Sequence, residues 1–423
     1  GAYAFYDCRK LTNVTLTDSL KSVGDYAFSR CIALDSIAVP ASVTELGIGT
    51  FSGSTSLIVT FNEPEKSKLT VLPELALSNT GIRTIVLPSG LTEIGTDAFF
   101  LCENLTSISL PASVKKLGDT VFRACSKLRT AELSAVTEMG EYVFQRATAL
   151  ESVSFAEGAT VIGDFAFGPN FTVDDWGNVV VLEDSVHKAL TTVTIPASVE
   201  EIGNYAFAFC TGLENLNLAN VKRIGAFAFT DCTQLKDLSF DSLEVLGAEE
   251  YAGKERISQT FYNCTSLTSI SMPNLEKIYE SAFYGCTNLA TVKMPRVKYI
   301  GIAAFYNCSL LRDVDFASAT TVDAMAFQNC ASLGDVTLPE ATGIGAGAFM
   351  YANNMQKVVM PKVTAIGERA FYGCSKLKEA SFPVAEEIYD LAFYNTKLTN
   401  PTLPATLEKV GAGAFGALMQ CDA

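Results

Sequence analysis

The segment Ile94-Gly95-Thr96-Asp97-Ala98-Phe99-Phe100-Leu101-Cys102-Glu103-Asn104-Leu105-Thr106-Ser107-Ile108-Ser109-Leu110-Pro111 contains the unit from which the chain is built. Its pattern, I-G-x-x-A-F-x-x-C-x-x-L-x-x-I-x-L-P, recurs about 18 times over residues 1–423, mostly at intervals of 22 or 23 residues. A fixed short period is typical of a solenoid, in which each unit buries its apolar face against its neighbours. The position of Phe99 marks each unit and is occupied by Phe5, Phe28, Phe51, Leu77, Phe99, Phe122, Phe144, Phe167, Phe207, Phe229, Phe261, Phe283, Phe305, Phe327, Phe349, Phe371, Phe393 and Phe415.

Each unit is predicted to have three parts. The first is a strand in which Leu105, Ile108 and Leu110 point inward while Thr and Ser alternate outward. Proline follows this strand in about ten units, and because it lacks an N–H it fixes where the strand ends. The second part is an extended return that ends in Ile-Gly. The third, x-x-A-F-x-x-C, is too short for a stable helix but long enough for one helical turn.

Two positions of the unit are expected to be tightly packed. Phenylalanines stacked about every 4.8 Å would touch the units on both sides. The glycine of Ile-Gly resembles a position of positive φ, but Pro73 falls in the same column and proline requires φ near −65°. Close packing is therefore the better explanation of that glycine.

Composition and charge exclude several classes of function. Apolar residues make up 48% and charged residues 18% of the chain, which suits a stacked interior and not disorder. The net charge of −15 argues against nucleic acid or an anionic membrane as partner. No apolar run approaches the roughly 18 residues of a membrane span. Because the repeat begins at once, near Phe5, we expect a truncated chain whose natural start, with an export signal, is missing.

Cysteine is concentrated in one column of the repeat, three residues after the marker. Eleven of the twelve cysteines lie there, and only Cys421 does not. Other units have Ser54, Ala147 or Ala352 at this position, so we interpret the column as a packing position filled by small residues with free buried thiols. Stacked strands lie within disulfide distance, which leaves disulfide pairing as the alternative.

Two insertions interrupt the repeat. Residues 168–190 contain alternating β-forming residues around Asp174, Asp175 and Trp176, which predicts a hairpin with Trp176 as a partner-binding anchor. The two aspartates could bind calcium, although a turn that needs Asp and Gly explains them equally well. The insertion at 247–258 is polar and is expected to be a surface loop.

The repeat resembles the bacterial leucine-rich repeat of BspA-like surface antigens, because L-x-x-I-x-L-P followed by V-x-x-I-G-x-x-A-F-x-x-C matches at nearly every position. The resemblance implies a mostly β, right-handed curved leucine-rich-repeat solenoid. One short strand per repeat would line the concave face, with helical turns or irregular structure on the convex side. It also implies export to the cell surface and adhesion to host or matrix proteins. The identity of the ligand does not follow from it.

The outward strand positions are the candidate ligand-binding surface, since solenoids commonly bind along such a face. Solubility of an exposed sheet is the alternative explanation. Acidic residues gather in the later units, which favours a basic partner. The candidate positions are Asn215, Asn217, Asp237, Ser239, Ser269, Ser271, Thr291, Lys293, Asp313, Asp315, Asp335 and Thr337.

A tyrosine column follows the marker residue and gives a second candidate. Stacked tyrosines could form a platform for sugars, so a carbohydrate-binding surface protein that uses this column or Trp176 is the alternative function. A ladder that merely covers the turn beneath it explains the column as well. The column contains Tyr6, Phe100, Tyr262, Tyr284, Tyr306, Tyr372 and Tyr394.

Residues that could carry catalysis are scarce. His187 is the single histidine, which excludes sites with several His ligands, and beside an insertion it fits an ordinary surface residue better than a general base. No phosphate-binding loop occurs. The sequence therefore predicts a non-enzymatic binding protein without catalytic residues, metal or cofactor, with an enzyme site under the 168–190 insertion as the weakest alternative.

Overall fold

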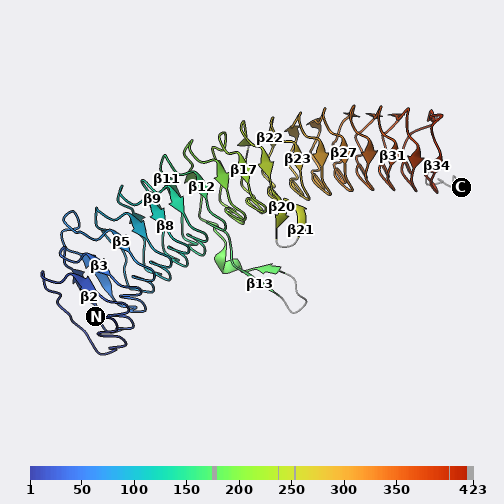
Figure 1. Cartoon of the computed structure of the whole chain (residues 1–423). Coiled ribbons are helices and arrows are strands. Elements are labelled where there is room, and N and C mark those ends of the chain that lie inside the picture. The colour runs from blue at the N-terminus through green and yellow to red at the C-terminus, as the bar shows by residue number, and fades with distance from the viewer. Residues whose placement is uncertain (174–178, 237, 252–253, 400, 417–423) are drawn as a thin grey trace. The chain divides into compact units, whose positions relative to one another are not determined.

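The structure is a computed structural model that describes residues 1–173, 179–236, 238–251, 254–399 and 401–416. These residues form two compact units, Gly1–Asn217 and Leu218–Ala423. Within each unit the chain winds into stacked turns, about 17 in total, joined by parallel strand pairs and with almost no helix. Figure 1 shows the regular stacking most clearly from β22 to β34.

Unit 1 contains two ladders of parallel strands. The first ladder is formed by the L-x-x-I-x-L segments, whose strands are β2 (Ser36–Val39), β4 (Ile58–Phe61), β7 (Ser107–Ser109), β9 (Thr130–Leu133), β11 (Ser152–Phe155) and β15 (Thr192–Thr194). The second ladder lies just before the glycine column, where we had expected only an extended return. Its strands are β1 (Ser22–Val23), β3 (Glu45–Leu46), β5 (Val71–Leu72), β6 (Glu93–Ile94), β8 (Lys116–Leu117), β10 (Glu138–Met139), β12 (Val161–Ile162) and β16 (Glu201–Ile202).

Unit 2 repeats this arrangement. Its first ladder comprises β18 (Leu238–Ser239), β22 (Ser269–Ser271), β24 (Thr291–Lys293), β26 (Asp313–Asp315), β28 (Val336–Thr337), β30 (Lys357–Val359) and β32 (Glu379–Ser381). Its second ladder comprises β17 (Arg223–Ile224), β19 (Val245–Leu246), β23 (Lys277–Ile278), β25 (Tyr299–Ile300), β27 (Thr321–Val322), β29 (Gly343–Ile344), β31 (Ala365–Ile366), β33 (Glu387–Ile388) and β34 (Lys409–Val410).

The two insertions each contain an antiparallel strand pair. In the first, β13 (Phe171–Val173) pairs with β14 (Val179–Val181), and the one 3₁₀-helix of the described residues, η1 (Glu183–Ser185), follows. In the second, which we expected to be a loop, β20 (Ala248–Tyr251) pairs with β21 (Lys254–Ile257).

The segment that follows the glycine column, which we call the turn arm, is not helical. In the arm that begins at Thr96, the amides of Asp97, Phe99 and Leu101 each donate to a carbonyl of the next turn at 3.0 Å. The intervening amides donate to the carbonyl three residues back in their own turn. Asp97 and Leu101 have φ of 56° and 58°, and the equivalent residues of most other arms are also left-handed. The alternation satisfies every amide of the arm from Asp97 to Cys102 without a helix.

The interior of each turn is filled by the residues that the repeat pattern selects. The marker phenylalanines are almost all fully buried. Within unit 2 their rings form a continuous parallel stack from Phe261 to Phe415, with centroids 5.1–5.4 Å apart. The expected aromatic column is therefore present.

The glycine column is explained by close packing, as expected. Gly345 does not have positive φ, and a Cβ added to it would lie 2.4 Å from the backbone nitrogen of Ala324 in the preceding turn. Gly343, two residues earlier on the same turn, has no atom within 4 Å of such a Cβ.

This contrast predicts opposite effects of one substitution. Gly345→Ala is expected to lower the free energy of unfolding by about 1–3 kcal/mol because the backbone of the preceding turn cannot move aside easily. Gly343→Ala should leave stability unchanged or raise it by about 0.4–1 kcal/mol, since it only restricts the unfolded chain. Urea denaturation of both variants measures the difference, and equal stabilities would contradict the packing explanation.

Candidate binding surfaces

The candidate residues of unit 2 lie on the outward face of the first ladder, in two files set by the strand register. Ser239, Ser271, Lys293 and Asp315 form one file across β18, β22, β24 and β26. Ser269, Thr291 and Asp313 form the other. We call these seven residues the strand-face files. Ser239, Lys293, Asp313 and Asp315 are exposed, and the other three residues are half-buried.

The strand-face files end at β26 because the first ladder is interrupted there. Strand β26 pairs with β24, whereas β28 belongs to a separate sheet with β30 and β32. Asp313 and Asp335 occupy equivalent positions of successive turns, and like charges on adjacent strands disfavour pairing. The Asp335 carboxylate instead accepts hydrogen bonds from the amides of Gln356 and Lys357, at 3.0 and 2.9 Å. Asp335 therefore orders the backbone of the next turn, a role that the alternating pattern did not reveal.

The remaining predicted positions are not part of these files. Asn215 and Asn217 are exposed but belong to unit 1. Thr337 lies on β28 and is in register with Val359 of β30. Asp237, Trp176, Asp174 and Asp175 lie outside the described residues.

The base of the 168–190 insertion is attached to unit 1 by contacts that the sequence pattern did not suggest. Phe171 packs edge-on against Phe165 and Tyr205, with centroids 6.2 and 5.4 Å apart. Phe165 itself stacks at 4.7 Å on Tyr142 and Tyr205, so β13 rests on an aromatic stack of three turns. These stacked rings occupy the left-handed position early in each arm. A closer alignment of the arms would have shown them as a second aromatic column.

Polar contacts complete this attachment. Arg146 forms an ion pair with Asp184 of η1 at 3.2 Å, and the Gln145 side chain donates to the Pro169 carbonyl at 3.0 Å. The Ser185 hydroxyl accepts from the amide of Asn170 at 2.8 Å. The insertion is thus held at both of its ends.

His187 is not a surface residue, which corrects the interpretation from the sequence. In the repeat the cysteine column lies three residues before the first strand Leu, as Cys102 precedes Leu105, and His187 precedes Leu190 by the same distance. The His187 side chain is fully buried, and its ring packs edge-on with Phe167. Among the described residues neither ring nitrogen has a hydrogen-bond partner. Burial lowers the pKa of His187 to about 4, so the ring is neutral at pH 7 and is closed to solvent as a general base.

The tyrosine column forms stacks that expose ring edges. Tyr284 lies parallel to Tyr262 and Tyr306, with centroids 4.8 and 4.7 Å away, and all three rings are half-buried. Both faces of Tyr284 are therefore covered by other tyrosines. A sugar that stacks on aromatic rings needs an open face, so the middle of this column is unsuited to the sugar platform that the sequence suggested.

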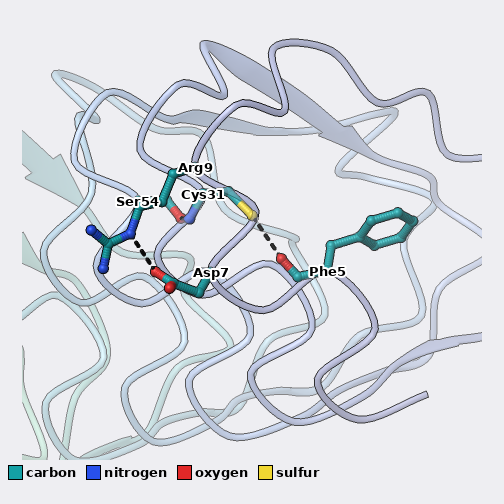
Figure 2. Close-up of polar contacts among 5 residues, drawn as sticks. All are labelled: Phe5, Asp7, Arg9, Cys31 and Ser54. Atoms are coloured by element: carbon teal, nitrogen blue, oxygen red, sulfur yellow. Dashed lines mark hydrogen bonds and ion pairs between the residues drawn. The ribbon is translucent and has the colours of Figure 1, made fainter.

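The cysteine column has a hydrogen-bonding role in addition to packing. Cys31 Sγ donates to the Phe5 carbonyl oxygen of the preceding turn at 3.0 Å, as Figure 2 shows. Ser54, one turn later, makes the same contact with Phe28 at 2.7 Å. The cysteines of the column are free, and all but the half-buried Cys8 are fully buried. Burial raises the pKa of Cys102 to about 11 and that of Cys286 to about 12, so these thiols are protonated at pH 7.

The described residues contain no cluster of three or more His, Cys, Asp or Glu side chains that could hold a metal ion. Nor do they contain a helix long and apolar enough to cross a membrane.

Family comparison matches the BspA type leucine-rich repeat region over residues 1–85, 70–173, 185–259, 254–361 and 342–421, which is nearly the whole chain. This chain belongs to the BspA-type leucine-rich repeat family. No curated protein matches it. BspA-type repeat proteins are typically associated with the cell surface.

Three solved structures are among those similar to this BspA-type chain. A leucine-rich repeat protein from Bacteroides ovatus is 21% identical with a TM-score of 0.57, covering 96% of this chain and 85% of its own. A leucine-rich cell surface protein from Faecalibacterium prausnitzii is 27% identical with a TM-score of 0.39, over 86% and 83% of the two chains. The pneumococcal vaccine antigen PcpA is 18% identical with a TM-score of 0.37, over 95% and 82%. The first of these likenesses supports the solenoid fold.

Proposed function

We propose that this BspA-type protein is a non-enzymatic binding protein of the cell surface or extracellular space, which adheres to a host or matrix protein through its solenoid surface. The observation that carries the proposal is the alignment of exposed side chains in the strand-face files. Six of these seven residues carry a hydroxyl group or a negative charge and so can contact a partner along four successive turns. Solenoids commonly use such a face for recognition.

The side chains that could take part in catalysis support a binding role instead. His187 is buried and neutral, and the column thiols are buried and protonated, so neither is presented to a substrate. We propose a location at the cell surface because BspA-type repeat proteins are typically found there. Trp176, which lies outside the described residues, remains part of the proposal as a second contact for the partner.

The charge of the strand-face files predicts the chemistry of that partner. Asp313 and Asp315 lie at the acidic end of the files, and Arg312 forms an ion pair with Asp313 at 3.6 Å. We therefore propose a basic protein surface as the occupant of this face. Binding through exposed charges should weaken as ionic strength rises, because salt screens such pairs.

The test uses purified collagen, laminin, fibronectin and vitronectin as immobilised probes. Replacing Asp313 and Asp315 together with Asn is expected to weaken binding about 2- to 25-fold, since each exposed pair contributes about 0.2–1 kcal/mol. The control variant, Glu103→Gln with Glu157→Gln, makes the same change of net charge in unit 1 and should bind normally. Absence of binding to every probe would refute the proposed function, and an unchanged affinity of the Asp variant would refute the role of this face.

A further inference from the structure

The ring of His187 occupies a space in unit 1 that the neighbouring turns provide. The preceding turn has Ala147 at the cysteine-column position, and the following turn has Cys210 there. Cys210 Sγ lies 3.9 Å from the Phe167 carbonyl oxygen, whereas the equivalent contact of Cys125 is 3.2 Å. A small side chain on one side and a lengthened contact on the other therefore accommodate the imidazole.

The backbone at His187 is held less firmly than at a regular column position. In a regular turn the column amide donates to the marker carbonyl, and the amide of the first strand Leu donates to the column carbonyl. Cys102 and Leu105 make these two bonds at 3.1 and 3.0 Å. Among the described residues the amides of His187 and Leu190 make neither bond. The segment that holds His187 therefore opens more easily than its counterparts in regular turns.

The pocket offers no counter-charge for a protonated imidazole. Among the described residues neither ring nitrogen has a hydrogen-bond partner, and the ring packs edge-on with Phe167. Burial lowers the pKa of His187 to about 4, and the backbone carbonyl of Phe144 opposes this by a smaller amount. No carboxylate of the described residues contributes to the shift. A protonated ring is therefore stable only after it reaches water.

The charged groups near this pocket pair with one another. Asp184 forms an ion pair with Arg146 of the preceding turn at 3.2 Å, and Lys188 forms one with Glu183 at 3.3 Å. The following turn contributes the thiol of Cys210 to the column. Surface ion pairs contribute little to stability, and ordinary carboxylates titrate near pH 4. Between pH 7 and 5 acid therefore acts on this segment mainly through His187.

We propose that His187 is a pH-sensitive switch that releases the C-terminal end of the 168–190 insertion from the stacked turns in mild acid. At neutral pH the uncharged ring holds residues 182–190 in place. In acid the ring takes up a proton and leaves its pocket, and the segment opens with it. Unfolded histidine has a pKa of about 6.5, so the stability from the buried neutral ring is complete above pH 6.5 and is lost as pH falls toward 4. This property is independent of the proposed binding function.

Hydrogen exchange of the full chain at pH 7 and pH 5, corrected for intrinsic exchange rates, measures the opening. The amides of Ser185 and Lys188 donate to carbonyls of their own segment and so report on it. Their opening equilibrium is expected to rise about 20-fold between pH 7 and 5. The equivalent segment around Cys286 is the internal control and should not change. His187 is the only histidine of the chain, so the NMR signal of an untagged protein follows the protonation of this one ring.

Two variants distinguish a switch from a structural role of the ring. His187→Cys introduces the residue that most other turns have in this column, and His187→Gln keeps a neutral polar side chain. Neither variant titrates between pH 7 and 5, so the opening should be the same at both pH values. Circular dichroism and urea denaturation at pH 7 verify folding.

Three results would overturn the switch. The first is a parent protein whose segment opens equally at pH 7 and 5. The second is a folded variant whose opening rises in acid as much as that of the parent. The third is exchange that rises along the whole chain together, including the Cys286 segment, because that pattern indicates global acid unfolding.

Discussion

Raising the pH from about 8 to about 10.5 under reducing conditions is expected to unfold the protein through its buried thiols. Burial raises the pKa of seven fully buried cysteines above the ordinary value of 9.0, and these are Cys102, Cys125, Cys264, Cys286, Cys308, Cys330 and Cys374. A thiol that is protonated when folded and ionised when unfolded favours the unfolded state increasingly above the unfolded pKa. The associated stability is complete below pH 9 and is lost as pH rises toward the folded pKa of about 11 for Cys102 and 12 for Cys286.

The expected effect is large because the thiols act together. Once the pH exceeds the unfolded pKa of about 9, each contributes up to about 1.4 kcal/mol per pH unit. Seven of them together therefore remove several kcal/mol between pH 9 and 10, a large part of the stability of a domain of roughly 5–15 kcal/mol. Urea denaturation at pH 8, 9 and 10 measures the slope.

A matched variant isolates the contribution of one thiol. Cys286→Ser removes an ionisable group but keeps the hydrogen bond, since Ser54 makes the equivalent contact in its own turn. Between pH 9 and 10 its loss of stability should be smaller than that of the parent by about 1 kcal/mol. Gly343→Ala should show the parent slope. A stability that stays constant from pH 8 to 10 would mean that the buried thiols are already ionised or oxidised in the folded protein.

Phe305→Ala is expected to lower the free energy of unfolding by about 3–5 kcal/mol, the usual cost of removing a buried aromatic ring. Phe305 is fully buried and stacks on Phe283 and Phe327 at 5.1 and 5.3 Å. The cavity would therefore remove contacts in three turns at once. Urea denaturation gives the loss, and hydrogen exchange should locate increased opening in the adjacent turns.

Two comparisons make this prediction specific. Phe305→Leu should cost less, because Leu77 occupies the same column in another turn and is fully buried there. Phe5→Ala should also cost less, since Phe5 is 40% exposed and stacks on Phe28. If the three substitutions had equal effects, the column would not be the main source of stability that its burial suggests.

The sequence predicted the parts of the fold in which one residue type serves one purpose in every turn. The repeat period, the marker phenylalanine and the inward residues of the strand all follow from the need to bury apolar side chains. In the glycine column, Pro73 was enough to show that close packing, and not positive φ, explains the glycine. The turn arm was harder to predict because its left-handed positions hold residues such as Asp97 and Leu101, which carry no glycine signal. Hydrogen bonds to neighbouring turns impose that conformation, and these bonds are non-local.

The candidate site was predicted less completely. Alternation identified the outward residues of β22, β24 and β26, but it could not show that the ladder stops after β26 or that Asp335 bonds to backbone amides. The burial of His187 was available from the sequence, by counting from Leu190 to the cysteine column.

Every hydrogen bond of a turn arm reaches its own turn or an adjacent one, and from Phe261 to Phe415 the markers are spaced evenly by 22 residues. Any single turn in that stretch can consequently be excised, or copied, without creating a mismatch between the turns that then meet. Unequal recombination between the encoding DNA repeats would yield shorter and longer proteins that fold equally well.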